Sequence, residues 1–222
     1  MVARSMGLRD ALEVAEVAFR SANDHVALRS PLFSTNPLRR WVVSSRIRFL
    51  GSEIQSRANT ALGLDFGPGF GVLLPYLSER HTKVLSVDVD PDCIRSARLY
   101  ASLAGLSNVE FQQVSGGSEL THVEDGSVDT IVAADVLEHL PHSVKVILEF
   151  RRVLSPSGFL FVSIPTENWM YRMFENDDAG HLYHDRTGYT DLREQLLAQF
   201  QIVKERSVLG LFGLFVLRNR RT

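Results

Sequence analysis

Between residues 62 and 71 the chain reads Leu62-Gly63-Leu64-Asp65-Phe66-Gly67-Pro68-Gly69-Phe70-Gly71. An apolar run leads to an acid, and glycine then recurs at every second position. We expect a buried strand that carries Asp65 to the carboxyl edge of a sheet, followed by a tight turn whose backbone can lie against a ligand. A nicotinamide-dinucleotide loop favours G-x-G-x-x-G with a pyrophosphate at a helix N-terminus. Here the spacing is G-x-G-x-G, and Asp65 suits a ligand with a cationic end.

A second strand that ends in an acid is predicted for residues 83–88, which read Lys83-Val84-Leu85-Ser86-Val87-Asp88. Asp88 follows Asp65 by 23 residues, which leaves room for one crossover helix from Val72 to about Arg80. An acid at such a strand end commonly accepts hydrogen bonds from ribose hydroxyls. Together the two acids predict that the ligand is a nucleoside that carries positive charge and no phosphate. S-adenosylmethionine fits, because its amino group and its sulfonium are cationic.

Two further motifs follow, and with the first two they carry a family resemblance. Residues 125–140 read Asp125-Gly126-Ser127-Val128-Asp129-Thr130-Ile131-Val132-Ala133-Ala134-Asp135-Val136-Leu137-Glu138-His139-Leu140. Residues 150–160 read Phe150-Arg151-Arg152-Val153-Leu154-Ser155-Pro156-Ser157-Gly158-Phe159-Leu160. In this order the motifs resemble the class I S-adenosylmethionine-dependent methyltransferases, near the small-molecule group that includes the ubiquinone and menaquinone biosynthesis enzymes. The resemblance covers residues 61–200.

The resemblance implies an α/β fold: a Rossmann-like, doubly wound, mostly parallel seven-stranded sheet with a C-terminal antiparallel hairpin. The pattern of elements agrees, because strands predicted at 109–114, 129–134 and 159–164 alternate with helices. Pro91 is predicted to begin one helix, and Thr190 to cap another. The hairpin is predicted from 201–206 and 214–218, with Gly210 and Gly213 between the strands.

Residues 1–58 precede these motifs, and we expect a helical extension there that caps the cofactor mouth. Helices are predicted for residues 10–19 and 40–57, and Pro31 and Pro37 are expected to break the chain. Residues 59–222 would form the methyltransferase domain, with an acceptor-lid insertion at about 165–190.

Composition limits the function further. The chain has 222 residues, a net charge of −2 and a pI near 6.4, which argue against a nucleic-acid binder that uses its whole surface. A single cysteine, Cys93, excludes an intramolecular disulfide. The most apolar run, residues 208–217, is about half the 20 residues that a membrane span needs. No secretory signal is evident, so we expect a soluble, cytoplasmic protein, monomeric or homodimeric.

The resemblance assigns cofactor contacts to named positions. Asp65 would accept the methionyl amino group, Asp88 would bind the ribose hydroxyls, and Val89 would pack against adenine. The backbone of the loop residues Gly67, Pro68, Gly69 and Gly71 would lie against the methionyl and ribose parts of the cofactor.

Two positions after later strands complete the expected cofactor site. Asp135 would close the pocket beneath the sulfonium, with the N-cap of a helix as its alternative role. The family usually places an acid after the third strand to contact the adenine amino group, but this chain has Ser115 there. Ser115, or a water, would then accept that hydrogen bond more weakly.

Methyl transfer from a sulfonium is an in-line displacement, so the acceptor must be held close to the methyl carbon. His139, at the start of the helix expected after the fourth strand, and His181, in the insertion, are candidates for a base that removes the acceptor's proton. For both, a structural role is the alternative. The acceptor pocket is predicted to be lined by Trp169, Tyr171, Phe174, Tyr183 and His184. His181 and His184 beside Asp185 also suggest a metal site, but no third ligand cluster supports one, and no metal is predicted.

The sequence therefore predicts a methyltransferase for a small, moderately apolar acceptor, with S-adenosylhomocysteine as the product. An RNA or protein methyltransferase is the alternative, since residues 1–60 hold nine arginines and five acids. Against it, Asp135-Val136-Leu137-Glu138 stands where amine methyltransferases carry an Asn/Asp-Pro-Pro-Tyr tetrapeptide. A non-catalytic binding protein with the same fold is a further alternative, because Ser115 replaces the usual acid.

Overall fold

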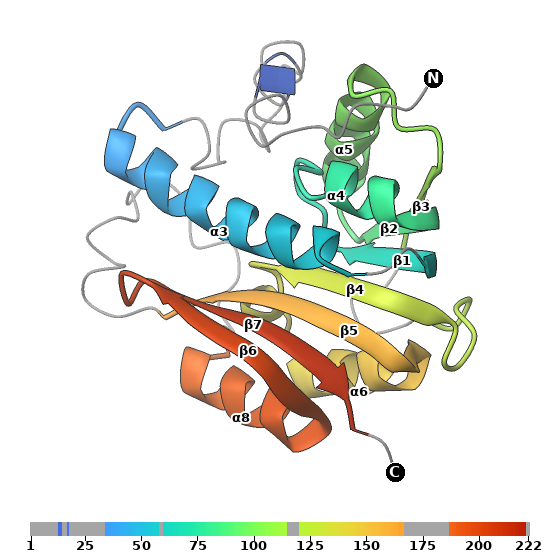
Figure 1. The fold of residues 1–222 in the computed structure, drawn as a ribbon, viewed down its shortest axis with the longest axis vertical. Helices are drawn as coiled ribbons and strands as arrows, with labels where there is room; N and C mark the ends of the chain where they lie inside the picture. The colour runs from blue at the N-terminus through green and yellow to red at the C-terminus, as the bar shows by residue number, and fades with distance from the viewer. Residues whose placement is uncertain are drawn as a thin grey trace. The chain divides into compact units, whose positions relative to one another are not determined.

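The computed structural model describes residues 13, 14, 17, 34–57, 60–114, 120–166 and 187–220 (Figure 1). The chain divides into two compact units, Met1–Gln113 and Val114–Thr222. Residues 13, 14 and 17, within the helix predicted for residues 10–19, are helical.

The described part of the first unit alternates helices with parallel strands. Its elements are α3 (Pro37–Gln55), β1 (Thr60–Phe66), α4 (Leu74–Arg80), β2 (His81–Asp88), α5 (Pro91–Leu103) and β3 (Val109–Gln113). β2 pairs in parallel with both β1 and β3. The helix predicted from Pro91 is confirmed, because Asp90 caps it by accepting a hydrogen bond from the Asp92 amide and proline fits the first helical position.

The start of α3 corrects the prediction that Pro37 breaks the chain and that the helix begins at Arg40. Pro37 is instead the first residue of α3, where its missing N–H would have no partner in any case. The Asn36 side chain accepts hydrogen bonds from the amides of Leu38 and Arg39 at 2.9 and 3.4 Å. An asparagine followed by a proline is therefore the start signal of this helix.

The second unit contains β4 (Val128–Ala134), the 3₁₀ helix η2 (Leu137–His139), α6 (Ser143–Val153), β5 (Leu154–Pro165), α8 (Tyr189–Gln199), β6 (Phe200–Val208) and β7 (Phe212–Asn219). β4 and β5 are parallel, whereas β7 is antiparallel to both β5 and β6. The predicted C-terminal hairpin is confirmed. Its turn places Leu209 and Gly210 at φ 52° and 69°, which is the backbone of a type I′ turn. Gly213 lies inside β7 rather than in the turn.

Two predicted boundaries in the second unit are wrong. α8 begins at Tyr189 after Gly188, and no side chain caps it, so Thr190 is a helical residue. β5 begins at Leu154, five residues before the predicted start, because the Ser155-Pro156-Ser157-Gly158 segment is extended. The Asn219 side chain donates a hydrogen bond to the Leu154 carbonyl at 3.0 Å, a tertiary contact that local sequence does not reveal.

All seven strands lie in one mixed sheet with the order β3-β2-β1-β4-β5-β7-β6, which confirms the predicted α/β fold. The strands carry the core, since Leu64, Val84, Ile131, Leu160 and Leu214 are fully buried. None of the helices in the described part of the chain has the length and apolar character that a bilayer crossing requires.

Candidate functional site

The loop that follows β1 requires glycine for its backbone. Gly67, Gly69 and Gly71 adopt φ angles of 71°, 51° and 81°, which side-chain-bearing residues rarely adopt. The Gly67 amide donates to the Val87 carbonyl at 2.9 Å, which ties the loop to β2. A Cβ at Gly71 would lie 2.8 Å from Leu74 Cδ1, whereas a Cβ at Gly69 would meet nothing within 4 Å. The loop is thus closely packed at Gly71 and open at Gly69.

Asp65 lies at the end of β1 and is 3% exposed. Its Oδ2 has no hydrogen-bond partner among the described residues. Burial, and to a lesser extent the nearby charge of Asp88, together raise the pKa of Asp65 from 3.8 to about 7. A buried carboxyl group with no cation beside it is unfavourable on its own, so this position is suited to a positively charged ligand group.

Asp88 is the last residue of β2 and is held by local hydrogen bonds. Its Oδ1 accepts from the Asp90 amide at 2.9 Å, and its carboxylate also interacts with the Cys93 thiol. Burial raises the pKa of Asp88, although the Asp90 hydrogen bond opposes that shift. These contacts fix the carboxylate of Asp88 beside the loop and leave acceptor capacity for a hydroxyl pair.

Val89 follows Asp88 and presents an apolar side chain that is 43% exposed. Its carbonyl accepts a hydrogen bond from the Gln113 side chain at 3.2 Å, which links the end of β2 to β3. An exposed valine at a strand end is a suitable surface for one face of a flat aromatic ring.

Ser86 is a residue of this region that the sequence reasoning missed. It is the register partner of Asp65 across β1 and β2, so the two side chains stand on the same face of the sheet. Ser86 is fully buried, and its Oγ has no hydrogen-bond partner among the described residues. The one indication in the sequence was a serine within an otherwise apolar strand.

The second unit places Asp135 directly after β4 in a left-handed conformation, with φ at 56°. The Asp135 amide donates to the Ser163 carbonyl at 2.9 Å, and the Ser163 hydroxyl donates to Asp135 Oδ1 at 2.5 Å. The alternative role of Asp135 as a helix N-cap is wrong, because Val136 and His142 hold the cap positions of η2 and α6. A non-glycine residue in this conformation costs about 1–3 kcal/mol and is typical of functional sites.

His139 is the last residue of η2, so the prediction that it starts a helix is wrong: α6 begins at Ser143. Its Nε2 lies 3.9 Å from Oε1 of Glu138, and the His139 side chain is partly exposed. The Glu138 side chain is almost fully buried. Pro141 and the short 3₁₀ turn separate β4 from α6, which delays the helix by four residues.

The remaining predicted site residues lie outside the described residues. They are Ser115, Trp169, Tyr171, Phe174, His181, Tyr183 and His184. In the part of the chain that the structure does describe, no three His, Cys, Asp or Glu side chains gather as metal ligands.

In the first unit, therefore, a glycine loop, a buried carboxyl group and a half-buried strand-end carboxylate lie together. S-adenosylmethionine fits these groups, because Asp65 offers an unpartnered acceptor for a cationic amino group, Asp88 offers acceptors for hydroxyls, and Gly69 leaves open space against the backbone.

Comparison with known proteins agrees with this arrangement. Residues 64–162 match the family described as "Methyltransferase domain". The ubiquinone biosynthesis O-methyltransferase of Xanthomonas euvesicatoria pv. vesicatoria (strain 85-10) is 30% identical over 135 residues, which cover 61% of this chain and 52% of that protein. The chain thus spans about half the length of the curated relatives it matches.

Two solved structures share the fold. The PH0226 protein of Pyrococcus horikoshii OT3 has a TM-score of 0.69 and 22% identity, over 86% of this chain and 97% of its own. A SAM-dependent methyltransferase from Aquifex aeolicus has a TM-score of 0.62 and 21% identity, over 92% and 98%. With its ordered motifs, its match to a methyltransferase domain over residues 64–162 and this fold, the chain is similar to the class I S-adenosylmethionine-dependent methyltransferases.

Proposed function

We propose that this chain transfers the methyl group of S-adenosylmethionine to a small, moderately apolar acceptor, with a hydroxyl oxygen as the preferred methylated atom. The observation that carries the proposal is the buried Asp65 carboxyl group, whose Oδ2 has no partner among the described residues, next to the glycine loop and Asp88. The preference for oxygen rests on the similarity to a ubiquinone biosynthesis O-methyltransferase.

Binding of the cofactor would use the first unit as follows. Asp65 accepts the methionyl amino group, directly or through a water, and becomes fully ionised when that cation is present. The backbone of Gly67, Pro68, Gly69 and Gly71 lies against the methionyl and ribose parts. A side chain at Gly69 would occupy the open space that the cofactor needs.

The nucleoside end would be held by the end of β2. Asp88 accepts hydrogen bonds from the ribose hydroxyls, since its rotamer is already fixed by the Asp90 amide. Val89 packs against one face of adenine, and Ser115 accepts from the adenine amino group. Each of these contacts is made without phosphate recognition, as the G-x-G-x-G spacing requires.

Bound S-adenosylmethionine supplies an electrophilic methyl carbon on a sulfonium whose departure leaves a neutral thioether. The chain then has to hold the acceptor oxygen in line with that carbon and exclude water. Asp135, whose strained backbone is fixed by Ser163, would lie near the positive sulfur. His139 or His181 would take the proton that the acceptor hydroxyl loses.

The acceptor pocket would come from the insertion at about 165–190, through Trp169, Tyr171, Phe174, Tyr183 and His184. Residues 59–222 would form the methyltransferase domain, and residues 1–58 a helical extension over the cofactor mouth. We further propose that the protein acts in the cytoplasm as a monomer or homodimer, without a bound metal.

Isothermal titration with S-adenosylhomocysteine tests the cofactor half of the proposal. We expect Asp88→Ala to weaken binding about tenfold to a hundredfold, because hydrogen bonds to a charged group contribute about 1.5–3 kcal/mol. Glu110→Gln is the matched control: Glu110 is an exposed strand acid that pairs with Lys83, so its loss should leave the affinity unchanged.

Methyl transfer to a panel of phenols, amines and activated carbon acids tests the acceptor half. Faster methylation of phenols than of amines supports the oxygen preference. No binding of either cofactor form contradicts the whole proposal. Tight cofactor binding with no turnover across the panel favours a non-catalytic member of the fold.

A further inference from the structure

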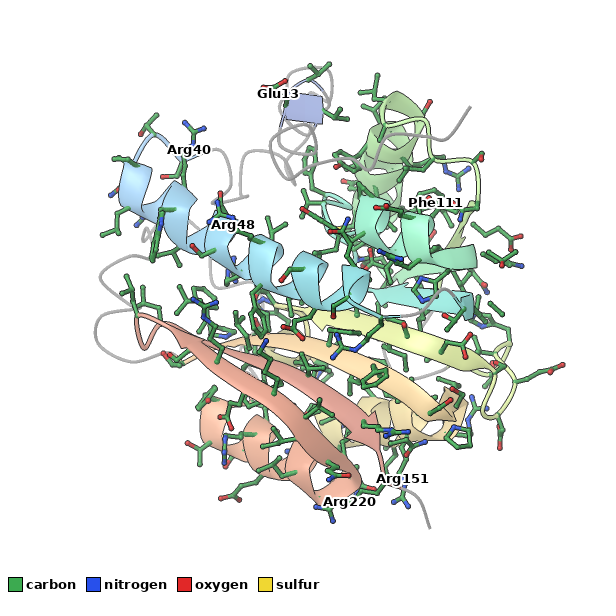
Figure 2. All side chains as sticks on the ribbon, viewed as in Figure 1. Glu13, Arg40, Arg48, Phe111, Arg151 and Arg220 are labelled. Atoms are coloured by element: carbon green, nitrogen blue, oxygen red, sulfur yellow. The ribbon has the colours of Figure 1, made fainter. Side chains whose placement is uncertain are left out.

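One face of α3 combines exposed apolar and cationic side chains. Leu38 and Trp41 are 42% and 49% exposed, and Arg48 is exposed as well. Residues spaced three and four apart share one face of a helix, so Leu38, Trp41 and Arg48 form a single stripe. Figure 2 shows the Arg40 and Arg48 side chains standing out from the α3 ribbon. We call Leu38, Trp41 and Arg48 the α3 stripe; Arg40 lies beside it, one residue before Trp41.

No acid of α3 offsets the positive charge near the stripe. From Asn36 to Ser52 the chain has four arginines and neither Asp nor Glu. Among the described residues, the guanidinium groups of Arg39, Arg40 and Arg48 make no ion pair or hydrogen bond. Arg39 and Arg40 also lie in the first turn, where the helix dipole disfavours cations and no acid is present. Arg39 and Arg40 therefore do not stabilise the helix itself, whereas the charge of Arg48 also acts on Tyr76 of α4.

The opposite face of α3 accounts for its place in the fold. Val42, Ile47, Leu50 and Ile54 are buried on that face. On the side of Arg48, by contrast, the C-terminal half packs on α4: a Cβ at Gly51, three residues after Arg48, would lie 2.7 Å from the ring of Tyr76, and the charge of Arg48 acts on that tyrosine. Figure 1 shows the N-terminal end of α3 extending away from α4. Leu38 and Trp41, at the N-terminal end of the stripe, are thus left exposed by packing among the described residues of the first unit.

The geometry points to the α3 stripe as a docking surface for an anionic lipid bilayer. Tryptophan and leucine on an interfacial helix bury their side chains at the headgroup boundary, and arginines beside them bind lipid phosphates. The interaction is peripheral and reversible, because two apolar side chains and a few cations provide only a modest affinity. If the proposed function holds, this docking would keep the chain at the bilayer, into which a moderately apolar acceptor partitions. Binding of the stripe to the bilayer requires neither cofactor nor acceptor.

RNA also offers phosphates and bases for aromatic stacking, but the stripe fits it less well. Exposed Leu38 has no counterpart in nucleotide recognition, where aromatic and cationic groups carry the binding. The net charge of −2 also argues against a nucleic-acid binder that uses its whole surface.

Co-sedimentation of the full chain with vesicles tests this surface. We expect binding to vesicles of phosphatidylglycerol mixed with phosphatidylcholine, weakened by salt, and none to phosphatidylcholine alone. The double variant Arg40→Gln/Arg48→Gln should bind about thirtyfold more weakly, because each cation near an anionic surface contributes roughly 1 kcal/mol, or about fivefold. Both side chains are exposed, so the variant should fold normally.

A matched control removes the same kinds of groups elsewhere. Lys204→Gln/Arg206→Gln deletes two exposed cations on β6, and should bind vesicles like the unchanged chain. The chain has two tryptophans, so Trp169→Phe leaves Trp41 as the only reporter. Its emission should shift to shorter wavelength when anionic vesicles are added.

Three results would overturn the assignment. They are absence of vesicle binding, equal loss of binding in the α3 and β6 variants, and salt-dependent binding of single-stranded RNA without vesicle binding. Since these assays contain no cofactor and no acceptor, their failure would leave the proposed methyl transfer untouched. Conversely, vesicle binding by a chain that does not bind S-adenosylhomocysteine would support the docking surface alone.

Discussion

Two clusters of charged side chains, one in each unit, differ in how their charges are balanced. In the second unit Arg152 donates to both Glu149 oxygens at 2.9 and 2.8 Å, to Asp125 at 2.5 Å, and to two backbone carbonyls. In the first unit the charge of Asp88 contributes to the raised pKa of Asp65, and among the described residues no cation pairs with Asp65.

The pKa shifts express the same difference. The Arg152 hydrogen bond holds the pKa of Glu149 below its usual value, so the folded state favours its charge. Burial instead raises the pKa of Asp65 to about 7, so the folded state disfavours that charge. The Arg152 cluster thus balances its charges within the protein, whereas among the described residues no cation balances the Asp65 carboxylate, which is neutralised by a proton or by a cationic ligand.

Asp65→Asn should give the largest effect, with opposite signs for stability and binding. A carboxyl group whose folded pKa is raised stabilises the fold fully below its unfolded pKa of 3.8, and this contribution is lost as pH rises through about 7. Asparagine is neutral throughout, so the variant should unfold at a higher urea concentration at pH 8, by on the order of 2–4 kcal/mol. The two proteins should differ little at pH 4.

The same variant should bind S-adenosylhomocysteine at least about a hundredfold more weakly at pH 8, because a charged acceptor for the amino group is gone. Glu110→Gln, also an acid-to-amide change on a strand, should alter neither quantity by much. A destabilised Asp65→Asn variant at pH 8 would show that the carboxylate has a partner within the protein, and would remove the contrast with Arg152.

The pH dependence of cofactor affinity should follow the ionisation of Asp65. Below pH 7 the empty site holds a proton that the cationic amino group must displace, so the Kd for S-adenosylhomocysteine should fall about tenfold per pH unit between pH 5 and 7. Above about pH 8 it should level off. Titration at pH 6 in two buffers of different ionisation enthalpy should reveal proton release on binding. A flat profile in the unchanged chain would contradict the assignment of Asp65 to the amino group.

Arg152→Met should reduce stability without changing binding. The Leu120 and Val123 carbonyls lose their donor, and Glu149 and Asp125 lose their cation, but water can solvate these partly exposed groups. We therefore expect a loss of about 1–2 kcal/mol in the free energy of unfolding. The neighbouring Arg151→Met, which removes a single hydrogen bond to Gln199, should cost less. Any loss of cofactor affinity in Arg152→Met would contradict the view that the Arg152 cluster serves stability and the Asp65 region serves binding.

The fold was largely predictable because its strands are apolar runs with acids or glycines at their ends. The boundaries that failed depend on contacts distant in the chain. Leu154 pairs with Val128 of β4 and accepts a hydrogen bond from Asn219, and Asp135 adopts its left-handed backbone because Ser163 satisfies both its amide and its carboxylate. No pattern of neighbouring residues encodes either contact.

The placement of the glycine loop and the two acids at neighbouring strand ends was predictable for a different reason: these residues are unusual at a buried strand end and therefore stand out in the sequence. Ser86 was not, because serine is common and its significance arises only from the register of β2 against β1. Burial without a partner is a property of the folded chain, which sequence alone does not provide.

Ser86→Ala should give the smallest effect and makes the finest test of the comparison. A fully buried hydroxyl without a partner among the described residues is destabilising in the empty protein, so its removal should leave stability unchanged or raise it slightly. If Ser86 helps Asp65 to hold the amino group or a bridging water, the Kd for S-adenosylhomocysteine should rise about twofold to fivefold. Ser163→Ala is the opposite case: its hydroxyl donates to Asp135, so its loss should lower the free energy of unfolding by about 1 kcal/mol. If the two serine variants were destabilised equally, the Ser86 hydroxyl would have a partner within the protein, as Arg152 does and Asp65 does not.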